Sequence, residues 1–390
     1  FEPRAIDGAV PLLIQMTYIP ALAIGGEMAL TFWTFASGWA AGIFLFVLAR
    51  AYLNLTWSLT IVLCFMTIPA VILGAGSGMV EIRNSLFVML TAFAIARALK
   101  TNQINFIILA GIGAGFFVGA KYLGLLFAAA AGITFLGQSD WFRRGLLYSI
   151  TILAIGSQWY IWNWLHIGDP LFPLLFDVIG NPNTPFWDSS HQAAMKSYLN
   201  NEIGVAVNFF WLFGYPIKAT LQSLPAFDSL RAGLGILPLL LVPFTLLGIW
   251  FNRSRIRHSD LLVYAFIIGF FYIVWFLTGS SQRIRHLLPL FPLVLLCLAV
   301  PAYHLKKQYN IGRPIVAAFA IAIALQLASH GLFTLKSARF VFSNESVNAY
   351  YERSVSWYQP VEWINNNLNK DDHVLSMVRW YEYLIDVPHY

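Results

Sequence analysis

Long apolar runs constrain this chain more than any other feature of its sequence. Of its 390 residues 58% are hydrophobic and 11% are charged, whereas soluble domains carry about 25% charged residues. A helix needs about 20 apolar residues to cross a bilayer, and about ten runs approach that length, near residues 28–50, 57–75, 84–99, 103–119, 122–138, 145–165, 232–251, 261–278, 286–303 and 314–335. The sequence therefore predicts an all-α polytopic membrane protein with about ten transmembrane helices.

Two places within the apolar sequence predict a break or a change of direction. The stretch GIGAGFFVGAKYLG (111–124) must hold a turn, because one helix from Asn102 to Gln138 would be nearly twice the bilayer length. Residues 9–25 are apolar but contain Pro11 and Pro20. We expect an interfacial helix there rather than a span.

The positive charges predict the orientation in the membrane. The chain has 24 Lys and Arg against 18 Asp and Glu, a net charge of +6, and basic loops remain in the cytoplasm. Alternate connections then form a cytoplasmic set that contains Arg50, Arg97, Lys100, Arg143, Arg144, Arg253, Arg255, Arg257, Lys306, Lys307 and Arg313. We expect a multi-pass protein of a bacterial inner membrane, with membrane lipids rather than nucleic acid as its surroundings.

The predicted orientation divides the chain into five parts. They are residues 1–27, the tail of a first extracytoplasmic loop; 28–165, an N-terminal transmembrane bundle; 166–231, an extracytoplasmic amphipathic loop; 232–337, a C-terminal bundle; and 338–390, the start of an extracytoplasmic soluble domain. In the last part HVLSMV (373–378) and YEYLIDVP (381–388) read as strands of a small α/β segment. We expect the chain to be a fragment at both ends, since it begins at Phe1 and its strands lack partners.

The predicted loop 166–231 is rich in Trp, Phe and Pro, as in NPNTPFWDSSH and FFWLFGYP. Aromatic side chains favour the level of the lipid head groups. We expect this loop to lie on the membrane surface and to roof a cavity.

Cations gather on the predicted extracytoplasmic face, where positive charge is normally sparse. These are Lys121, in GAKYLGLLF, and Arg283 and Arg285, in GSSQRIRHLLPLFP. Phosphate is the natural partner of clustered Arg and Lys, although each side chain could instead snorkel to the head groups. Residues two apart on a helix point to different sides, and we expect Arg285, the deeper of the pair, to be the ligand.

Other polar residues on that face have weaker signals. Glu81 could face the cavity as an acid, complement the helix dipole, or pair with Arg83. His166, Asp169, Asp188 and His191 could bind a metal or orient a hydroxyl, but solvated loop positions explain them as well. No metal site is assigned, and Cys64 and Cys297 lie in apolar runs as packing residues.

Five segments together resemble one family, the GT-C membrane glycosyltransferases that use polyprenyl- or dolichyl-phosphate sugars, which include protein O-mannosyltransferases and the lipid A aminoarabinose transferase. The segments are LARAYLNLTWSLTIVLCFMTIPAV (48–71), the acid at Glu81, LAGIGAGFFVGAKYLGLLF (109–127), YIWNWLHIGDPLFPLLF (160–176) and SQRIRHLLPLFPLVLL (281–296). The resemblance covers most of the chain and rests on the order and spacing of these segments.

The resemblance implies transfer of a sugar from a polyprenyl-phosphate donor to a lipid, glycan or protein acceptor outside the cytoplasm, with inversion at the anomeric carbon. It implies that Lys121, Arg285 and Arg283 bind the donor phosphate, with Glu81 as a second acid. Tyr122, His286, Asn163 and Asp169 are expected to line the cavity. The family's catalytic aspartate is expected upstream of Phe1, because Asp7 does not lie in a copy of that motif. No cofactor is implied with certainty, and a divalent metal is compatible with the chemistry.

Two departures from the family pattern leave the donor and the activity open. His286 stands where the pattern has Tyr, and Asp169 where it usually has Asn. A non-catalytic scaffold subunit of a larger membrane complex therefore stays an alternative. So does a transporter of an anionic lipid or solute, which would need a path open to both faces and would be supported by broken helices in both halves of the chain.

Overall fold

The computed structural model describes residues 10–179, 187–228, 233–278, 281–309, 311–376 and 379–389. These residues form α-helices and short 3-10 helices and contain no strand beyond one isolated bridge, between Val374 and His389. Five helices are long and apolar enough to span a membrane, or six if one bent pair is a single span; these five are Gln15–Arg50, Glu81–Thr101, Leu261–Thr278, Ile284–Tyr309 and Gly312–Leu332. The protein is an all-α integral membrane protein.

The chain divides into two compact units, Phe1–Gln326 and Leu327–Tyr390. Helices up to the middle of the first unit are η1 Gln15–Thr17, α2 Tyr18–Arg50, α3 Leu55–Met66, α4 Pro69–Ala75, α5 Glu81–Thr101, α6 Ile104–Ala120, α7 Leu123–Gly132, η2 Ile133–Gly137, α8 Trp141–Gly156 and α9 Gln158–Ile167. The next are α10 Phe176–Ile179, α11 Ser189–Asn200, α12 Phe209–Leu221, η3 Pro225–Phe227, α14 Leu237–Phe251, α15 Arg253–Arg257, α16 Leu261–Thr278, η4 Ile284–Leu290 and α17 Phe291–Tyr309, and α18 Gly312–Phe342 continues into the second unit.

Each of the ten apolar runs contains a helix or a pair of helices, but the count of ten transmembrane spans is not confirmed. Three of the runs form apolar helices shorter than a span, Ile104–Ala120, Leu123–Gly137 and Leu237–Phe251. The run at 145–165 divides into α8 and α9 near Ser157. The interfacial helix expected at 9–25 overlaps the first turns of α2. Non-helical backbone angles at Gly25 and Gly26 separate these turns from the rest of α2.

Two helix breaks shape the site. Helices α3 and α4 are bent by 71°, because Pro69 lacks an N–H and forces the preceding Ile68 into an extended conformation. The predicted turn in 111–124 is confirmed: α6 ends at Ala120, and Lys121 is extended with φ −166° and ψ 144°. The chain turns so closely that a Cβ atom at Gly124 would overlap the backbone of Phe117.

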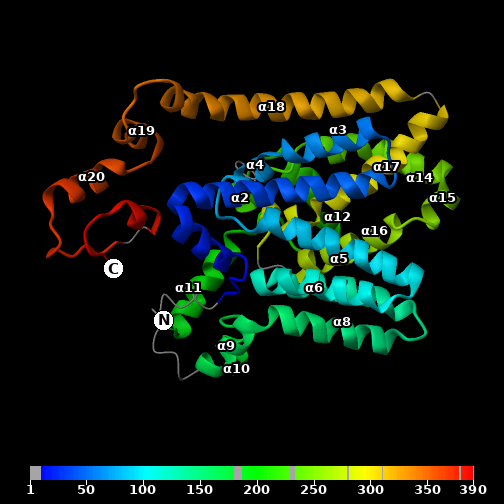
Figure 1. The fold of residues 1–390 in the computed structure, drawn as a ribbon, viewed down its shortest axis with the longest axis horizontal. Helices are drawn as coiled ribbons and strands as arrows, with labels where there is room; N and C mark the ends of the chain where they lie inside the picture. The colour runs from blue at the N-terminus through cyan, green and yellow to red at the C-terminus, as the bar shows by residue number, and fades with distance from the viewer. Residues whose placement is uncertain are drawn as a thin grey trace. The chain divides into compact units, whose positions relative to one another are not determined.

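Helix α5 lies at the centre of the first unit. Figure 1 shows α5, α6 and α8 running side by side, and α5 also packs against α2, α16 and η4. Glycines allow the close contact of α6 with α8, since a Cβ atom at Gly111 would lie 2.6 Å from the Cβ of Thr151. The hydroxyl of Ser85 donates to the carbonyl of Leu288 at 3.2 Å, which joins the first turns of α5 to η4.

The second unit is helical where the structure describes it. It contains the end of α18, α19 Val347–Ser354, α20 Tyr358–Asn367 and η5 Arg379–Leu384. A small core holds Tyr358, Val361, Ile385 and Val387. The predicted strands are not confirmed: η5 occupies the first half of 381–388, and Met377 and Val378 lie outside the described residues.

Candidate functional site

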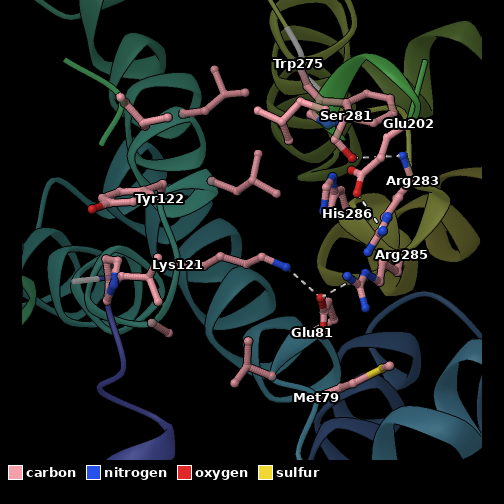
Figure 2. A pocket seen from close by; sticks show the side chains of 18 of the residues that line it. Met79, Glu81, Lys121, Tyr122, Glu202, Trp275, Ser281, Arg283, Arg285 and His286 are labelled. Atoms are coloured by element: carbon pink, nitrogen blue, oxygen red, sulfur yellow. Dashed lines mark hydrogen bonds and ion pairs between the residues drawn. The ribbon is translucent and has the colours of Figure 1, made fainter. Parts of the chain in front are cut away.

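A cavity of about 740 Å³ opens at the ends of several helices of the first unit. Its charged residues come from the start of α5, the break after α6, the segment after α11, and the turn that leads into η4; Figure 2 shows them around one hollow. Apolar walls are supplied by residues such as Leu126, Leu174, Leu199 and Trp275. The predicted loop 166–231 thus contributes one side of the cavity wall. The cavity combines a cationic end with apolar surface.

Lys121 and Glu81 form a close ion pair in the cavity. Lys121 Nζ lies 2.6 Å from Glu81 Oε1, and Figure 2 shows the lysine extending across the cavity toward that carboxylate. Lys121 can reach it because the helix break places its side chain on the inner wall. Arg83, the local partner considered for Glu81, instead donates to the carbonyls of Met79 and Ser77 and lies over the ring of Tyr18. Neither snorkelling of Lys121 nor a local Glu81–Arg83 pair therefore describes the arrangement.

Arg285 is the cation of the cavity with the weakest compensation. Its Nε lies 3.9 Å from Glu81 Oε1 and 3.7 Å from Asp228 Oδ2, both beyond hydrogen-bond distance. The same Nε is buried and makes no hydrogen bond to any described residue. A buried guanidinium N–H without an acceptor is costly. Arg285 is therefore positioned to receive an additional oxyanion.

Arg283 is paired with residues of the segment at the end of α11. Its Nη2 lies 2.6 Å from Glu202 Oε1 and donates to the Tyr198 hydroxyl at 2.8 Å. Arg283 is still extended, with ψ 124°, and the 3-10 helix begins only at Ile284. Because the chain is not yet helical there, both arginines reach the cavity. The two-residue spacing does not separate them as it would on a regular helix.

Gln282 holds the wall segment that carries Glu202. Its Oε1 accepts from the backbone N–H groups of Gly204 and Val205, each at 2.9 Å, and its Nε2 donates to the Val205 carbonyl at 2.8 Å. Its own backbone N–H donates to the Glu202 carbonyl at 3.0 Å, and its carbonyl accepts from Tyr215. These bonds fix Glu202 next to Arg283.

The other expected cavity residues divide into two groups. His286 and Tyr122 line the cavity; His286 Nδ1 is buried without a hydrogen-bond partner among the described residues. The Tyr122 hydroxyl points away from the charged cluster and donates to the Phe172 carbonyl at 2.6 Å. Asn163 and Asp169 are fully buried and do not line the cavity. Asp169 accepts from the N–H of Leu171, and burial raises the pKa of its carboxyl.

Sequence reasoning did not identify four residues that build the site: Tyr198, Glu202, Asp228 and Gln282. Three lie in the segment that was expected to be an aromatic surface loop and to roof a cavity, and Gln282 directly precedes Arg283. Glu202 had no distinctive signal, since it follows a polar stretch, KSYLNN, in the predicted loop. Which cation it would meet depends on packing.

The metal interpretation finds no support in the part of the chain that the structure describes. Those residues contain no group of three or more His, Cys, Asp or Glu side chains placed to hold a metal ion. Asp188 instead begins α11 by accepting from the N–H groups of Ser190 and His191, and it pairs with the His191 ring at 2.8 Å. His166 Nδ1 lies 2.9 Å from the Trp162 carbonyl.

A scan against models of known protein families matches no family, and a search of curated proteins finds no significant relative. The cavity is therefore the feature from which a function can be inferred.

Proposed function

We propose that this protein is a GT-C-like membrane glycosyltransferase that binds a polyprenyl-phosphate-linked sugar in the cavity of Glu81, Lys121, Arg283 and Arg285. The environment of Arg285 carries the proposal. Its guanidinium lines the cavity, and its Nε has no hydrogen-bond partner among the described residues. The nearest carboxylate oxygens, of Asp228 and Glu81, lie 3.7 and 3.9 Å from that Nε. A phosphodiester would supply the missing acceptor through a charge-assisted hydrogen bond.

The cavity suits an amphipathic ligand. Its charged cluster would face the phosphate, and the apolar residues Leu126, Leu199 and Trp275 would face the first carbons of an isoprenoid chain. Its volume of about 740 Å³ lies within the roughly 300–1,000 Å³ of small-molecule sites. That is room for a sugar phosphate, with the long hydrocarbon chain left in the membrane.

The proposed reaction moves the sugar and leaves the lipid phosphate. An acceptor hydroxyl or amine forms a bond to the anomeric carbon, the bond from that carbon to the phosphate oxygen breaks, and the electron pair stays on the phosphate. The acceptor proton passes to a carboxylate base, a role to which we assign none of the acids of the cavity. Arg285, with Lys121 and Arg283, would stabilise the charge that accumulates on the leaving phosphate.

Glu81 has a more limited role in this proposal than that of a free acid. Its Oε1 lies 2.6 Å from Lys121 Nζ, so the carboxylate is already engaged by a cation. We assign it to positioning Lys121 and Arg285 rather than to proton transfer. It also keeps the cavity from holding uncompensated positive charge before the donor binds.

The proposed topology places this cavity on the extracytoplasmic face of a bacterial inner membrane. It keeps about ten crossings, with the shorter apolar helices completing the bundle, and an extracytoplasmic C-terminal unit. The acceptor would be a lipid, glycan or protein on that face, and further membrane subunits could share the bundle.

The experiment compares two alanine variants, with expression and membrane insertion matched. Arg285→Ala should abolish transfer from undecaprenyl-phosphate-linked sugars, and Arg253→Ala should not, because Arg253 is exposed and lies over Trp250 outside the cavity. The parent protein should bind undecaprenyl phosphate more tightly than the neutral alcohol undecaprenol. In Arg285→Ala this preference, the ratio of the two affinities, should fall about tenfold or more. Equal behaviour of the two variants would reject the assignment.

Two further measurements separate the alternatives. Binding of the phosphate without transfer from any donor would favour a non-catalytic scaffold. Movement of the lipid across proteoliposomes would favour a transporter. Broken helices in both halves of the chain would support a transporter; within the described residues the one bent pair of membrane length, α3 and α4, lies in the first half.

A further inference from the structure

A second cavity of about 220 Å³ lies at the opposite ends of α16 and α17 from the first one. The first cavity is lined by Trp275, near the end of α16, and by Arg285, before α17. The second is lined by Leu261, at the start of α16, and by His304, near the end of α17. Its other walls come from Tyr52 and from the residues around α15. We call it the basic-end cavity.

The surroundings of the basic-end cavity place it at the level of lipid head groups. Helices α16 and α17 belong to two of the segments long enough to cross a membrane, and their ends meet here. Tyr309, the last residue of α17, has its ring 4.8 Å from that of Phe251, the last residue of α14. Tyr side chains favour the boundary between hydrocarbon and head groups. The cavity therefore opens where phosphates of the bilayer are available.

The polar groups of the cavity form an incomplete anion site. Arg255 Nη1 lies 3.4 Å from His304 Nδ1. Ser259 and Tyr52 complete the polar wall, but the Ser259 hydroxyl already donates to the Ile256 carbonyl at 2.7 Å and the Tyr52 hydroxyl interacts with Asp260, so Arg255 is the main group for an anion. Among the described residues no carboxylate pairs with Arg255; the neighbouring Asp260 is engaged by Lys100. A guanidinium beside a ring nitrogen, without an anion, is complementary to a phosphate.

Two nearby cations, Arg253 and Lys306, are held by aromatic rings and do not line the cavity. Arg253 lies over the ring of Trp250 at 4.0 Å, and Lys306 lies over the ring of Trp57 at 4.7 Å. Both charges are therefore held on aromatic faces, and neither residue lines the cavity. Arg255 is the cation directed to it.

We propose that the basic-end cavity binds the phosphate of an anionic phospholipid head group. A volume of about 220 Å³ is below the roughly 300–1,000 Å³ of pockets that enclose a whole drug-sized ligand, so it accommodates a head group and leaves the acyl chains outside. The apolar wall residues Ile256 and Val300 suit a lipid better than free phosphate. This site is separate from the proposed glycosyltransferase cavity and does not depend on its function.

The test is native mass spectrometry of the full chain in detergent, titrated with phosphatidylglycerol, phosphatidylcholine or inorganic phosphate. We expect one saturable phosphatidylglycerol site, with affinity at least tenfold above that for phosphatidylcholine. Arg255→Gln should weaken it about tenfold or more, by loss of a charge-assisted bond, and His304→Leu should weaken it several-fold. The matched control Arg253→Gln should stay within about twofold, and Arg285→Gln should leave it unchanged, which separates this site from the first cavity.

Three results would overturn the proposal. Equal loss in Arg253→Gln and Arg255→Gln would mean that only the overall positive charge attracts the lipid. Equal binding of phosphatidylcholine would mean that the phosphate is not recognised through an anionic head group. Binding of inorganic phosphate as tight as that of phosphatidylglycerol, with the same loss in Arg255→Gln, would assign the site to a soluble anion.

Discussion

Lys121 Nζ lies 2.6 Å from Glu81 Oε1, although the two residues are 40 positions apart, Glu81 at the start of α5 and Lys121 in the break after α6. The Glu81 side chain is 6% exposed and that of Lys121 is 29% exposed. The pair therefore joins the start of α5 to the break between α6 and α7 at the cavity wall. Each charge is held in place by the other.

Removal of one partner should destabilise the protein more than removal of both. We expect Glu81→Gln or Lys121→Met to lower the free energy of unfolding by about 1–3 kcal/mol, below the roughly 3–5 kcal/mol of fully buried pairs because Lys121 reaches the cavity. The double variant should recover part of the loss. Unfolding followed in detergent would measure this, with the exposed Glu352→Gln as the control. Additive losses would show that the two charges are not coupled.

Close packing of α6 on α8 predicts opposite effects for two glycines of one helix. A Cβ atom at Gly156 would overlap the carbonyl of Gly115, whereas one at Gly145 would meet nothing within 4 Å. Gly156→Ala should cost about 1–3 kcal/mol by pushing the helices apart. Gly145→Ala should be neutral or stabilising by up to about 1 kcal/mol, because alanine favours the helix. Thermal unfolding of the two variants gives the comparison; a Gly156→Ala protein as stable as the parent contradicts the packing.

Gln282 should determine how firmly the wall segment at Glu202 is held. The Gln282 side chain forms three hydrogen bonds with the backbone of Gly204 and Val205 and is 1% exposed. Gln282→Met keeps the shape but leaves these backbone groups unpaired, at a cost of about 1–3 kcal/mol each. Hydrogen exchange should become faster in residues 203–205. The exposed Gln308→Met should leave that exchange unchanged, and protection retained in both variants would refute the role.

The start of α11 should depend on pH through Asp188. Hydrogen bonds from the Ser190 hydroxyl and from the backbone and ring of His191 hold the pKa of the Asp188 carboxyl below its usual range. A carboxyl whose pKa is lowered in the folded state contributes stability above its unfolded pKa of about 4, and this is lost as the pH falls further. Asp188→Asn should keep the cap without the pH dependence, because Asn is also a good N-cap residue.

Fluorine NMR of fluorotryptophan-labelled protein would measure this effect at the adjacent Trp187, whose ring stacks on His191 at 5.6 Å. Its signal can be assigned by its loss in Trp187→Phe. We expect that signal to shift below about pH 4 in the parent and to stay constant in Asp188→Asn. The same shift in both proteins would mean that another group titrates there.

Much of the fold could be predicted from local sequence, because the signals act over short distances. Runs of apolar residues predicted helices at every place where the structure has its membrane-length segments, and the length limit of one bilayer correctly required the turn at Lys121. The predicted strands are not confirmed, and strands are harder to predict for the opposite reason. A strand is stabilised by neighbouring strands and by the side chains packed on it. In the structure, residues 381–384 belong to the 3-10 helix η5, and Ile385 and Val387 pack in a small core with α20.

The sequence by itself determined that the chain is a membrane protein and that Lys121, Arg283, Arg285 and Glu81 stand at the ends of apolar runs. It did not determine their partners. Only the tertiary structure decided that Glu81 meets Lys121 rather than Arg83, that Glu202 meets Arg283, and that Asn163 and Asp169 lie outside the cavity wall. The physical reason is that apolar patterning acts along the chain, whereas an ion pair forms only between groups that packing brings within a few ångströms.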